Sequence, residues 1–235
     1  MLNNSLSVVL PAYNEEGNIL EIINKILKIL PSVTYDFEII AVDDGSTDKT
    51  ANILEKLKAS DARLKVVRHP RNLGYGASLR SGFKKVEKEL IFYMDADQQF
   101  DIADITRLTA YIEDYDIVIG FRKNRRDPFY RSFFSYCFNL IVKSLFGIKF
   151  QDINCGFKLF KREALQKMTL FSTGSLISAE TLTKARIHQL RIKQVAVNHY
   201  PRIYGRQTGS SLKVILTILW EMGKLKMQLA KPASQ

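Results

Sequence analysis

The alternation of short apolar runs with amphipathic stretches over the first 120 residues is the feature that most restricts the fold of this chain. The runs have the length of buried strands, and the stretches between them carry apolar residues at helical spacing. The predicted strands are residues 6–10, 37–42, 64–68 and 90–94, and the predicted helices between them are residues 16–30, 47–60 and 75–86. Strands that alternate with helices of this length predict an α/β fold, a largely parallel sheet with helices on both faces.

Three further helices and one further strand are predicted after residue 100. A helix at residues 102–114 and an apolar run at residues 116–119 continue the alternation. Of the two later helices, residues 132–146 are apolar and aromatic, and residues 211–230 are basic and amphipathic. Helices of this kind either pack on the protein core or lie on a membrane surface, and the sequence leaves both interpretations open.

Composition bounds the partners that the chain can have. With 235 residues, 46% of them hydrophobic and 25% charged, the chain is long enough for one large α/β domain or two small ones. No apolar run reaches the roughly 18 residues that a membrane-spanning helix needs, and the N-terminus lacks the pattern of a secretory signal. The two cysteines favour a reducing compartment over a disulfide framework. The net charge of +11 favours an anionic partner, either a nucleotide, a nucleic acid or an acidic membrane.

Polar clusters follow three of the predicted strands. They are Pro11-Ala12-Tyr13-Asn14-Glu15, Asp43-Asp44-Gly45-Ser46-Thr47-Asp48 and Asp95-Ala96-Asp97. The carboxyl ends of parallel strands lie at one edge of a sheet, which is where open α/β sheets bind their ligands. Each cluster alone is also typical of a turn, the second of a turn before a capped helix. Because all three occur at the same edge, we expect them to meet in a binding site.

Two of these clusters suit a nucleoside. Tyr13 offers a ring face to a base, and either Asp43 or Asp44 can accept hydrogen bonds from base or ribose donors. Gly74 and Gly76 permit a close approach of the backbone at the next strand end. They do not complete a GxGxxG pattern, and the chain has no GxxxxGK[ST] loop. These absences argue against a dinucleotide-binding fold and against a P-loop nucleotidase.

The third cluster suits a divalent cation. Asp95 and Asp97 would repel a diphosphate unless a cation lay between them, and carboxylates are ligands that such cations prefer. Gln99 supplies a third oxygen two residues further on. An isolated pair of this kind is more often a solvated turn, and it is the company of the other two clusters that favours a metal site.

Several motifs together resemble the family 2 glycosyltransferases of the GT-A fold. The donor half contains PAYNE at 11–15, DDGSTD at 43–48, NLGYGASLRSG at 72–82 and DADQQ at 95–99. Later matches are GFR at 120–122, RSFFS at 131–135, DINCGFKLFKRE at 152–163 and RQTGSS at 206–211. These later motifs are similar to dolichyl-phosphate mannose synthase and related polyprenyl-phosphate glycosyltransferases. The resemblance covers most of residues 6–211 in order.

On the donor side, the resemblance implies a nucleotide-sugar pocket and a metal. Together with neighbours in the same clusters, the predicted nucleotide-sugar site comprises Pro11, Ala12, Tyr13, Asn14, Glu15, Val42, Asp43, Asp44, Gly76, Asp95 and Ala96. The resemblance implies Mg²⁺ or Mn²⁺ on the diphosphate, with the ligands Asp95, Asp97 and Gln99.

On the acceptor side, the resemblance implies arginines that bind phosphate. Arg122, Arg131 and Ser135 would bind the acceptor phosphate, and Arg206 would stabilise the leaving diphosphate. Arginine suits these tasks because its planar fork can bind two oxygens at once. Without the resemblance, the segment from Arg122 to Arg131 is typical of a solvated basic loop. Asp97 and Arg206 are the residues to which we assign the catalytic roles.

The implied reaction is a single displacement with inversion, in which a lipid phosphate attacks the anomeric carbon of a hexose. The donor would be of the GDP-mannose or UDP-glucose type. Many relatives with hydroxyl acceptors carry an acidic pair where this chain has Ile177 and Ser178. A phosphate monoester, with a second pKa of about 6, is already ionised and needs no strong base, so the missing acids favour a phosphate acceptor. Glu180 and His199 are more readily interpreted as structural than as catalytic.

Two departures separate the chain from the mannose synthases. They have a lysine directly after RxxGxS, where this chain has Leu212, followed by Lys213. The segment HYPR at residues 199–202 is closer to bacterial relatives.

We expect one glycosyltransferase domain with three parts. Residues 1–121 form the nucleotide-sugar half, residues 122–211 the acceptor half and residues 212–235 a helical tail. The enzyme would be peripheral on the cytoplasmic face of a membrane, working on polyprenyl or dolichyl phosphate alone or with a membrane-embedded partner subunit. One alternative is a soluble transferase for a polysaccharide or protein hydroxyl, and another is a non-catalytic nucleotide-sugar-binding protein. We expect no nucleic-acid partner, because no helix-turn-helix, zinc or RNA-binding signature occurs.

Overall fold

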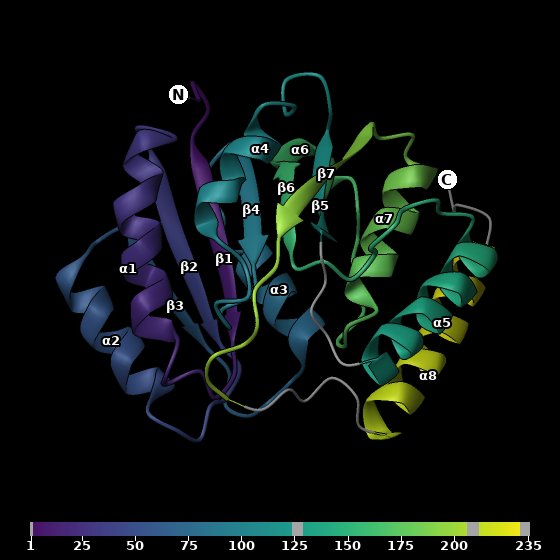
Figure 1. The fold of residues 1–235 in the computed structure, drawn as a ribbon, viewed down its shortest axis with the longest axis horizontal. Coiled ribbons are helices and arrows are strands. Elements are labelled where there is room, and N and C mark those ends of the chain that lie inside the picture. The colour runs from purple at the N-terminus through teal and green to yellow at the C-terminus, as the bar shows by residue number, and fades with distance from the viewer. Residues whose placement is uncertain (1, 124–128, 206–211, 231–235) are drawn as a thin grey trace.

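The fold is a seven-stranded sheet with helices on both faces (Figure 1). A computed structural model describes residues 2–123, 129–205 and 212–230, without the side chains of residues 129–137, 212–216 and 230. The strands are β1 (Leu6–Ala12), β2 (Phe37–Asp43), β3 (Leu64–Arg68), β4 (Leu90–Met94), β5 (Ile117–Lys123), β6 (Phe157–Lys161) and β7 (Ile192–Asn198). The helices are α1 (Ile19–Ile29), α2 (Thr50–Ser60), α3 (Tyr75–Phe83), α4 (Ile105–Thr109), α5 (Phe129–Phe146), α6 (Arg162–Gln166), α7 (Ile177–Ile187) and α8 (Leu212–Ala230), with 3₁₀ turns η1 (Leu30–Ser32) and η2 (Ile102–Asp104).

The strand order is β3-β2-β1-β4-β6-β5-β7. All neighbouring pairs are parallel except those of β6, which is antiparallel to both β4 and β5. The predicted α/β class with a mostly parallel sheet is therefore confirmed. Four parallel strands from the first 94 residues form one side of the sheet, and strands from both predicted halves of the chain share it.

Alternate residues of each strand point to opposite faces, so the sheet has two cores. On one face, Val8, Phe92 and Leu159 pack with the apolar sides of α1, α2 and α4. On the other face, Val9 and Ile91 pack with residues of α3, α5, α6, α7 and α8. Because both faces of the sheet are covered, its strands are apolar on both sides, and all seven residues of β1 and of β2 are buried.

Local chemistry explains where several elements begin and end. Strands β3 and β4 have the predicted bounds. Strand β1 runs two residues further than predicted, through Pro11, because β4 pairs with β1 only as far as Val9 and leaves one edge of the strand without a ladder there. Helix α1 buries its isoleucines at spacings of three and four and gives way to η1, which contains Pro31.

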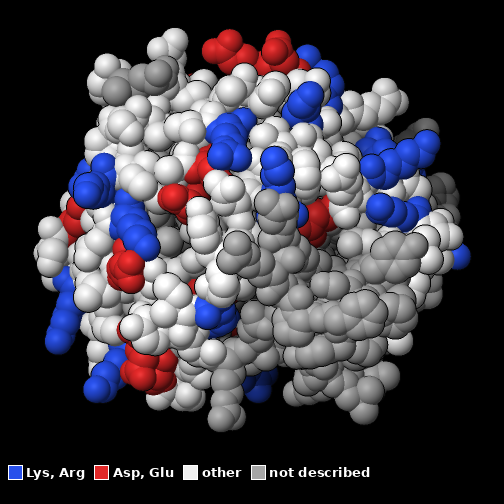
Figure 2. All heavy atoms as spheres, viewed as in Figure 1, with Lys and Arg blue, Asp and Glu red and all other residues white. Residues whose placement is uncertain are grey.

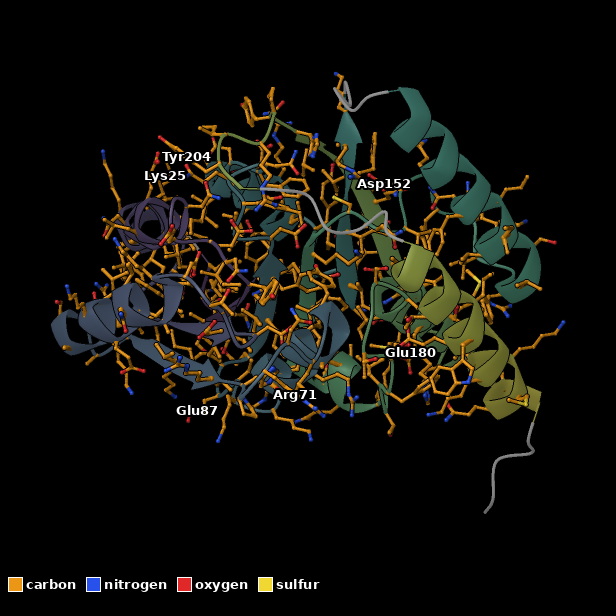
Figure 3. The ribbon with its side chains drawn as sticks, turned by 90° about the horizontal axis from the view of Figure 1, so that it is seen from below. Lys25, Arg71, Glu87, Asp152, Glu180 and Tyr204 are labelled. Atoms are coloured by element: carbon orange, nitrogen blue, oxygen red, sulfur yellow. The ribbon has the colours of Figure 1, made fainter. Side chains whose placement is uncertain are left out.

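Helices α5 and α8 lie side by side at the end of the molecule away from α1 and α2 (Figures 1 and 3). Both bury one side in the second core, through Val142 and Phe146 of α5 and Met222 and Leu225 of α8. Both also expose large apolar side chains, namely Leu140, Ile141, Leu145, Leu219, Trp220, Met227 and Leu229. Among the helices in the described parts of the chain, none is long and apolar enough to cross a membrane.

Candidate functional site

The first two polar clusters meet at the carboxyl edge of the sheet, as predicted. The backbone N–H of Asn14 donates to Ser46 Oγ at 2.9 Å, and Asn14 Oδ1 accepts from the backbone N–H of Thr47 at 2.8 Å. The backbone N–H of Glu15 donates to Thr50 Oγ1 at 2.8 Å. Asn14 has a φ of +55°, an uncommon backbone conformation that these hydrogen bonds hold in place.

The third cluster joins the first through an arginine from the loop after β7. Arg202 forms an ion pair with Glu15, and its Nη1 lies 3.4 Å from Asp97 Oδ2. Asp97 Oδ1 accepts from the backbone N–H of Gln99 at 3.1 Å. Arg202 therefore links two clusters that lie 82 positions apart in sequence, and sequence reasoning gave it no role.

Burial shapes the electrostatics of the carboxylate pair. Burial, reinforced by the charge of Asp97, raises the pKa of Asp95 to about 7. Burial also raises the pKa of Asp97, against the backbone N–H of Gln99 and the charge of Arg202. The same desolvation raises the pKa of Glu15. An added cation would relieve the cost of keeping these carboxylates ionised.

Two residues in or beside β6 contact or influence the carboxylate of Asp95. Gly156 lies in the turn before the strand, and Lys158 lies within it. The backbone N–H of Asp95 donates to Gly156 O at 3.2 Å, and a Cβ added at Gly156 would overlap the Asp95 carboxylate. Lys158 is fully buried, donates to Cys155 O and lies over the ring of Tyr93 at 5.3 Å. Its charge lowers the pKa of Asp95. Burial raises the pKa of the Cys155 thiol to about 12, so this cysteine stays a neutral packing residue.

The donor set fits a hard divalent cation. Asp95 and Asp97 are two carboxylates in one partly exposed turn, and the guanidinium of Arg202 already lies against one of them as a positive charge. Among the described residues, no group of three or more His, Cys, Asp or Glu side chains is arranged to hold a metal ion. A metal at this pair would therefore complete its coordination with oxygens of water or of a bound diphosphate. The predicted third ligand, Gln99, donates its side-chain amide to Tyr200 O at 3.1 Å, and its metal role stays a prediction.

The acidic pair after β2 is occupied by protein donors. Asp44 is buried and accepts from the backbone N–H groups of Leu73 and Gly74, each at 2.9 Å, and from His69 Nδ1 at 2.7 Å. Asp43 is buried and accepts from the backbone N–H of Ser46 at 2.9 Å. These carboxylates organise the loops at the edge of the sheet, and the nucleoside contact predicted for Asp43 or Asp44 stays a prediction.

The remaining residues of the predicted nucleotide-sugar site differ in how far they are buried and in what they contact. Pro11, Ala12 and Ala96 are buried at the strand ends, and Tyr13 is partly exposed. Val42 is fully buried in the core, so its side chain faces other protein atoms. Gly76 donates its N–H to Thr173 O at 2.8 Å, and a Cβ there would lie 2.6 Å from Ser172 O. Protein backbone thus approaches Gly76 closely, and its place in the nucleotide-sugar site stays a prediction.

Arg122, one of the predicted acceptor residues, is bound by a carboxylate in a forked pair. Its Nε and Nη2 lie 2.6 Å and 2.8 Å from the two oxygens of Asp152. The charge of Arg122 lowers the pKa of both Asp95 and Asp97, so the guanidinium acts electrostatically on the carboxylate pair. The side chains of Arg131 and Ser135, within α5, and all of Arg206 lie outside the described residues.

Glu180 and His199 have structural partners. Glu180 is fully buried, accepts from the backbone N–H groups of Phe171 and Ser172 and pairs with Lys184 at 2.7 Å. Figure 3 shows Glu180 on the side of the molecule where α7 and α8 lie. His199 packs edge-to-face on Phe100, with ring centres 5.4 Å apart. Both agree with the structural interpretation of these residues.

On the face that Figure 2 draws, the described basic side chains are not gathered in one stripe. Figure 2 shows Lys and Arg spread over one face and interspersed with Asp and Glu.

A family model described as Glycosyl transferase family 2 matches residues 7–169. The chain belongs to glycosyltransferase family 2. This confirms the resemblance drawn from the sequence motifs.

Two family 2 relatives extend over nine tenths of the chain. Dodecaprenyl-phosphate galacturonate synthase of Rhizobium johnstonii is 29% identical over 221 residues, covering 91% of this chain and 65% of the relative. Undecaprenyl-phosphate 4-deoxy-4-formamido-L-arabinose transferase of Proteus mirabilis is 31% identical over 217 residues, covering 90% and 65%. The chain thus spans just under two thirds of the length of each. Both are named for polyprenyl-phosphate acceptors, and neither is named for mannose or dolichol.

Solved structures with the same fold confirm the architecture of this chain. Glucosyl-3-phosphoglycerate synthase of Mycobacterium tuberculosis, in complex with Mn²⁺, UDP and glucosyl-3-phosphoglycerate, superposes with a TM-score of 0.70 at 21% identity, covering 94% of this chain and 81% of that one. Its complex with Mn²⁺, UDP-glucose and phosphoglyceric acid gives a TM-score of 0.71 at 23% identity, covering 94% and 80%. At this identity the likeness establishes the GT-A fold alone.

Proposed function

We propose that the chain is a metal-dependent, inverting glycosyltransferase that moves a sugar from a nucleotide sugar to a polyprenyl phosphate. The observation that carries this proposal is the carboxylate pair Asp95 and Asp97 at the carboxyl edge of the sheet, with Arg202 against it and the charge of Arg122 acting on both carboxylates. Such a site offers a cation position and arginines for two phosphate groups. The polyprenyl-phosphate names of both relatives support the acceptor class.

On the donor side, the chain's own residues would position and neutralise the diphosphate. A divalent Mg²⁺ or Mn²⁺ would be held by Asp95 and Asp97 and would supply positive charge to the leaving diphosphate. Arg202 would exchange part of its contact with Asp97 for a diphosphate oxygen, and Arg206, four residues later, would add a second guanidinium. Stabilising charge where it grows in the transition state is the contribution that usually dominates such catalysis.

On the acceptor side, no general base is needed. A phosphate monoester is largely ionised at neutral pH, so one of its oxygens can attack the anomeric carbon directly, with inversion. The buried Glu180 is fully engaged by backbone donors and Lys184, which is consistent with this mechanism. Arg122, its fork fixed by Asp152, would face the acceptor phosphate together with Arg131 and Ser135.

We propose a UDP-linked donor ahead of a GDP-linked one. The structural neighbours were crystallised with UDP or UDP-glucose and with Mn²⁺ or Mg²⁺, and their fold spans 94% of this chain. The sugar is proposed to lie in the class of the relatives, a uronic acid or a modified pentose, before a plain hexose. The likeness to mannose synthase has less support, since neither relative is named for mannose.

The lipid would reach the site along α5 and α8. These neighbouring helices expose Leu140, Ile141, Trp220 and Met227, and α8 also carries Lys224 and Lys226. Apolar side chains interleaved with lysines suit the boundary of an acidic bilayer. We therefore propose that the acceptor half and the tail lie against the cytoplasmic face of a membrane, alone or with a membrane-embedded partner.

The test is a transfer assay with separated products. Purified protein is incubated with Mn²⁺ or Mg²⁺, vesicles that contain polyprenyl phosphate, and each of a panel of radiolabelled UDP- and GDP-sugars. We expect label to enter the organic phase with one UDP-linked donor and to require the metal. Asp114→Asn, the same change at an exposed carboxylate, is the matched control for Asp97→Asn and should transfer sugar normally.

Other outcomes identify the alternatives. Label that enters only a soluble glycan or protein would favour the hydroxyl acceptor. Donor binding without transfer to any acceptor would favour a nucleotide-sugar-binding protein. Either result overturns the polyprenyl-phosphate proposal.

A further inference from the structure

The loop Phe171–Gly174, here the Thr173 loop, lies between three helices and has no part in the mechanism above. Helix α7 binds it through Glu180, whose oxygens accept from the backbone N–H groups of Phe171 and Ser172 at 3.0 Å and 2.8 Å. Arg80 of α3 donates to Phe171 O at 2.9 Å. The ring of Phe171 lies between the ammonium groups of Lys184 and Lys224, at 4.9 Å and 5.1 Å.

Helix α8 binds the same loop through a buried carboxylate. Glu221 is 1% exposed, and its Oε1 accepts from Thr173 N at 2.7 Å, Thr173 Oγ1 at 3.0 Å and Gly174 N at 3.1 Å. A carboxylate out of water is costly unless it is hydrogen-bonded. All three donors reach Oε1, while Oε2 is buried without a hydrogen-bond partner among the described residues. The loop therefore supplies the hydrogen bonds that offset the cost of burying Glu221, and these bonds fix α8 and the Thr173 loop to one another.

The other side of the loop fixes the start of α3. Thr173 O accepts from the backbone N–H groups of Gly76 and Ala77 at 2.8 Å and 3.2 Å. A Cβ at Gly74 would lie 2.5 Å from Thr173 O, and one at Gly76 would lie 2.7 Å from Gly174 O. The loop therefore takes the free N–H groups of the first helical turn and leaves no room for side chains beside Tyr75.

Tyr75 connects this junction to the carboxylate pair. Its hydroxyl donates to Asp95 Oδ1 at 2.7 Å, and a Cβ added at Gly156 would overlap the same carboxylate. A hydrogen bond to a ligating carboxylate fixes which oxygen, and which lone pairs, face the metal.

We propose that Tyr75 is a positioning residue for Asp95 and that Glu221 positions Tyr75 through the Thr173 loop, coupling helix α8 to the metal-binding carboxylates. The coupling rests on the proposed function only in taking Asp95 as a metal ligand. The chain of contacts is Glu221 to Thr173, Thr173 to Gly76, and Tyr75 to Asp95. Any partner that displaces α8 would then change the affinity of the site for metal without touching it.

The test is a double-mutant cycle on Mn²⁺ affinity, because spatial connection alone does not demonstrate coupling. Mn²⁺ binding to wild type, Tyr75→Phe, Glu221→Gln and the double variant is measured by calorimetry and by the free-Mn²⁺ electron paramagnetic resonance signal. Tyr75→Phe should weaken binding by about tenfold, within the range for partners of metal ligands. Glu221→Gln should weaken it by about threefold, since it acts through the loop. The double variant should bind about as weakly as Tyr75→Phe alone.

Matched controls separate positioning from a loss of stability. Glu38→Gln alters another buried glutamate that accepts a hydrogen bond from a backbone N–H. It lies near the start of β2, at the amino end of the sheet. Tyr115→Phe removes a hydroxyl before β5. Both should keep wild-type Mn²⁺ affinity whatever they do to the melting temperature. Thr173→Val, which removes only one donor to Glu221, keeps the cycle measurable if Glu221→Gln does not fold.

Three results would overturn the coupling. These are unchanged Mn²⁺ affinity in Tyr75→Phe, a Glu221→Gln variant that behaves like Glu38→Gln, and strictly multiplicative effects in the double variant. A wild type that binds no Mn²⁺ overturns the coupling and the metal part of the proposed function together. A wild type that binds Mn²⁺ but transfers no sugar overturns the proposed function alone, and the cycle still decides the coupling.

Discussion

Two acidic pairs lie at the ends of parallel strands on the same edge of this sheet, and Asp44 of the first pair has an environment opposite to that of the second pair. Asp44, in the pair after β2, is buried among backbone N–H groups that satisfy both of its oxygens. Asp95 and Asp97, after β4, lie together with fewer donors, and burial raises the pKa of each. The comparison teaches that an acidic pair at a strand end is either a structural anchor or a cation site, according to how many protein donors surround it.

The largest expected effect is the loss of transfer in Asp97→Asn. This change removes a negative ligand from the site and leaves the amide in place of the carboxylate. We expect transfer to fall by at least about a hundredfold, with the far-ultraviolet circular dichroism and melting temperature close to wild type. Wild-type turnover in this variant would contradict the assignment of Asp97 as a metal ligand.

Gly156→Ala should displace one carboxylate of the same pair, that of Asp95. The added Cβ would overlap the Asp95 carboxylate, which must then rotate or move. We expect transfer to fall by roughly 30-fold or more, together with weaker Mn²⁺ binding, in the range seen when support of a metal ligand is lost. The matched control is Gly223→Ala in α8, where an added Cβ meets no atom within 4 Å and transfer should be unaffected. Equal activities in the two variants would show that the Asp95 carboxylate has room to adapt.

Asp44→Asn should show the opposite signature to Asp97→Asn. Its amide group would face the N–H of Gly74 or of Leu73, so one buried donor loses its acceptor. We expect the free energy of unfolding to fall by about 2 kcal/mol, or roughly 5 °C in melting temperature. Residual transfer below the melting transition should exceed that of Asp97→Asn. A fully stable Asp44→Asn variant would remove the distinction between the two pairs.

The smallest effect is a pH-dependent stability difference at Asp95. Its raised pKa means that the folded protein binds the proton more tightly than the unfolded chain, so the free energy of unfolding falls as pH rises from about 4 toward 7. Asparagine cannot ionise, so metal-free Asp95→Asn should gain on wild type by on the order of 2 kcal/mol between pH 5 and pH 7, and keep the gain above pH 7. Urea unfolding at pH 5 and pH 8 measures it. A gap that is constant with pH would contradict the raised pKa.

Much of the fold could be predicted because the first half has strong periodicity. Strands β3 and β4 have the bounds that their apolar runs predicted. Strand β6 was missed, because a buried strand with Lys158 in its middle does not read as an apolar run. Helix α7 was also missed, since it is buried nearly all round and shows little amphipathic pattern.

The site could be predicted as a place but not as a network. The three clusters and the carboxylate pair follow from topology, because strand ends of a parallel sheet share an edge. Four residues were not assigned, since each acts through a partner at least 20 residues away in sequence; they are Arg202, Asp152, Tyr75 and Lys158. Tyr75 lies inside a quoted motif, yet nothing in its neighbours in sequence points to Asp95. Only the folded chain pairs them.

The antiparallel strand β6 has a consequence for the order in which the chain can fold. The block β3-β2-β1-β4 is fully encoded by residue 94, but the second edge of β4 pairs with β6, which begins at residue 157. Until that strand arrives, β4 presents an open edge, and long-range pairings of this kind form slowly. The neighbours of Asp95 arrive with it, since Gly156 and Lys158 belong to the same segment. During synthesis, the scaffold of the donor half can therefore form well before its carboxylate pair is set.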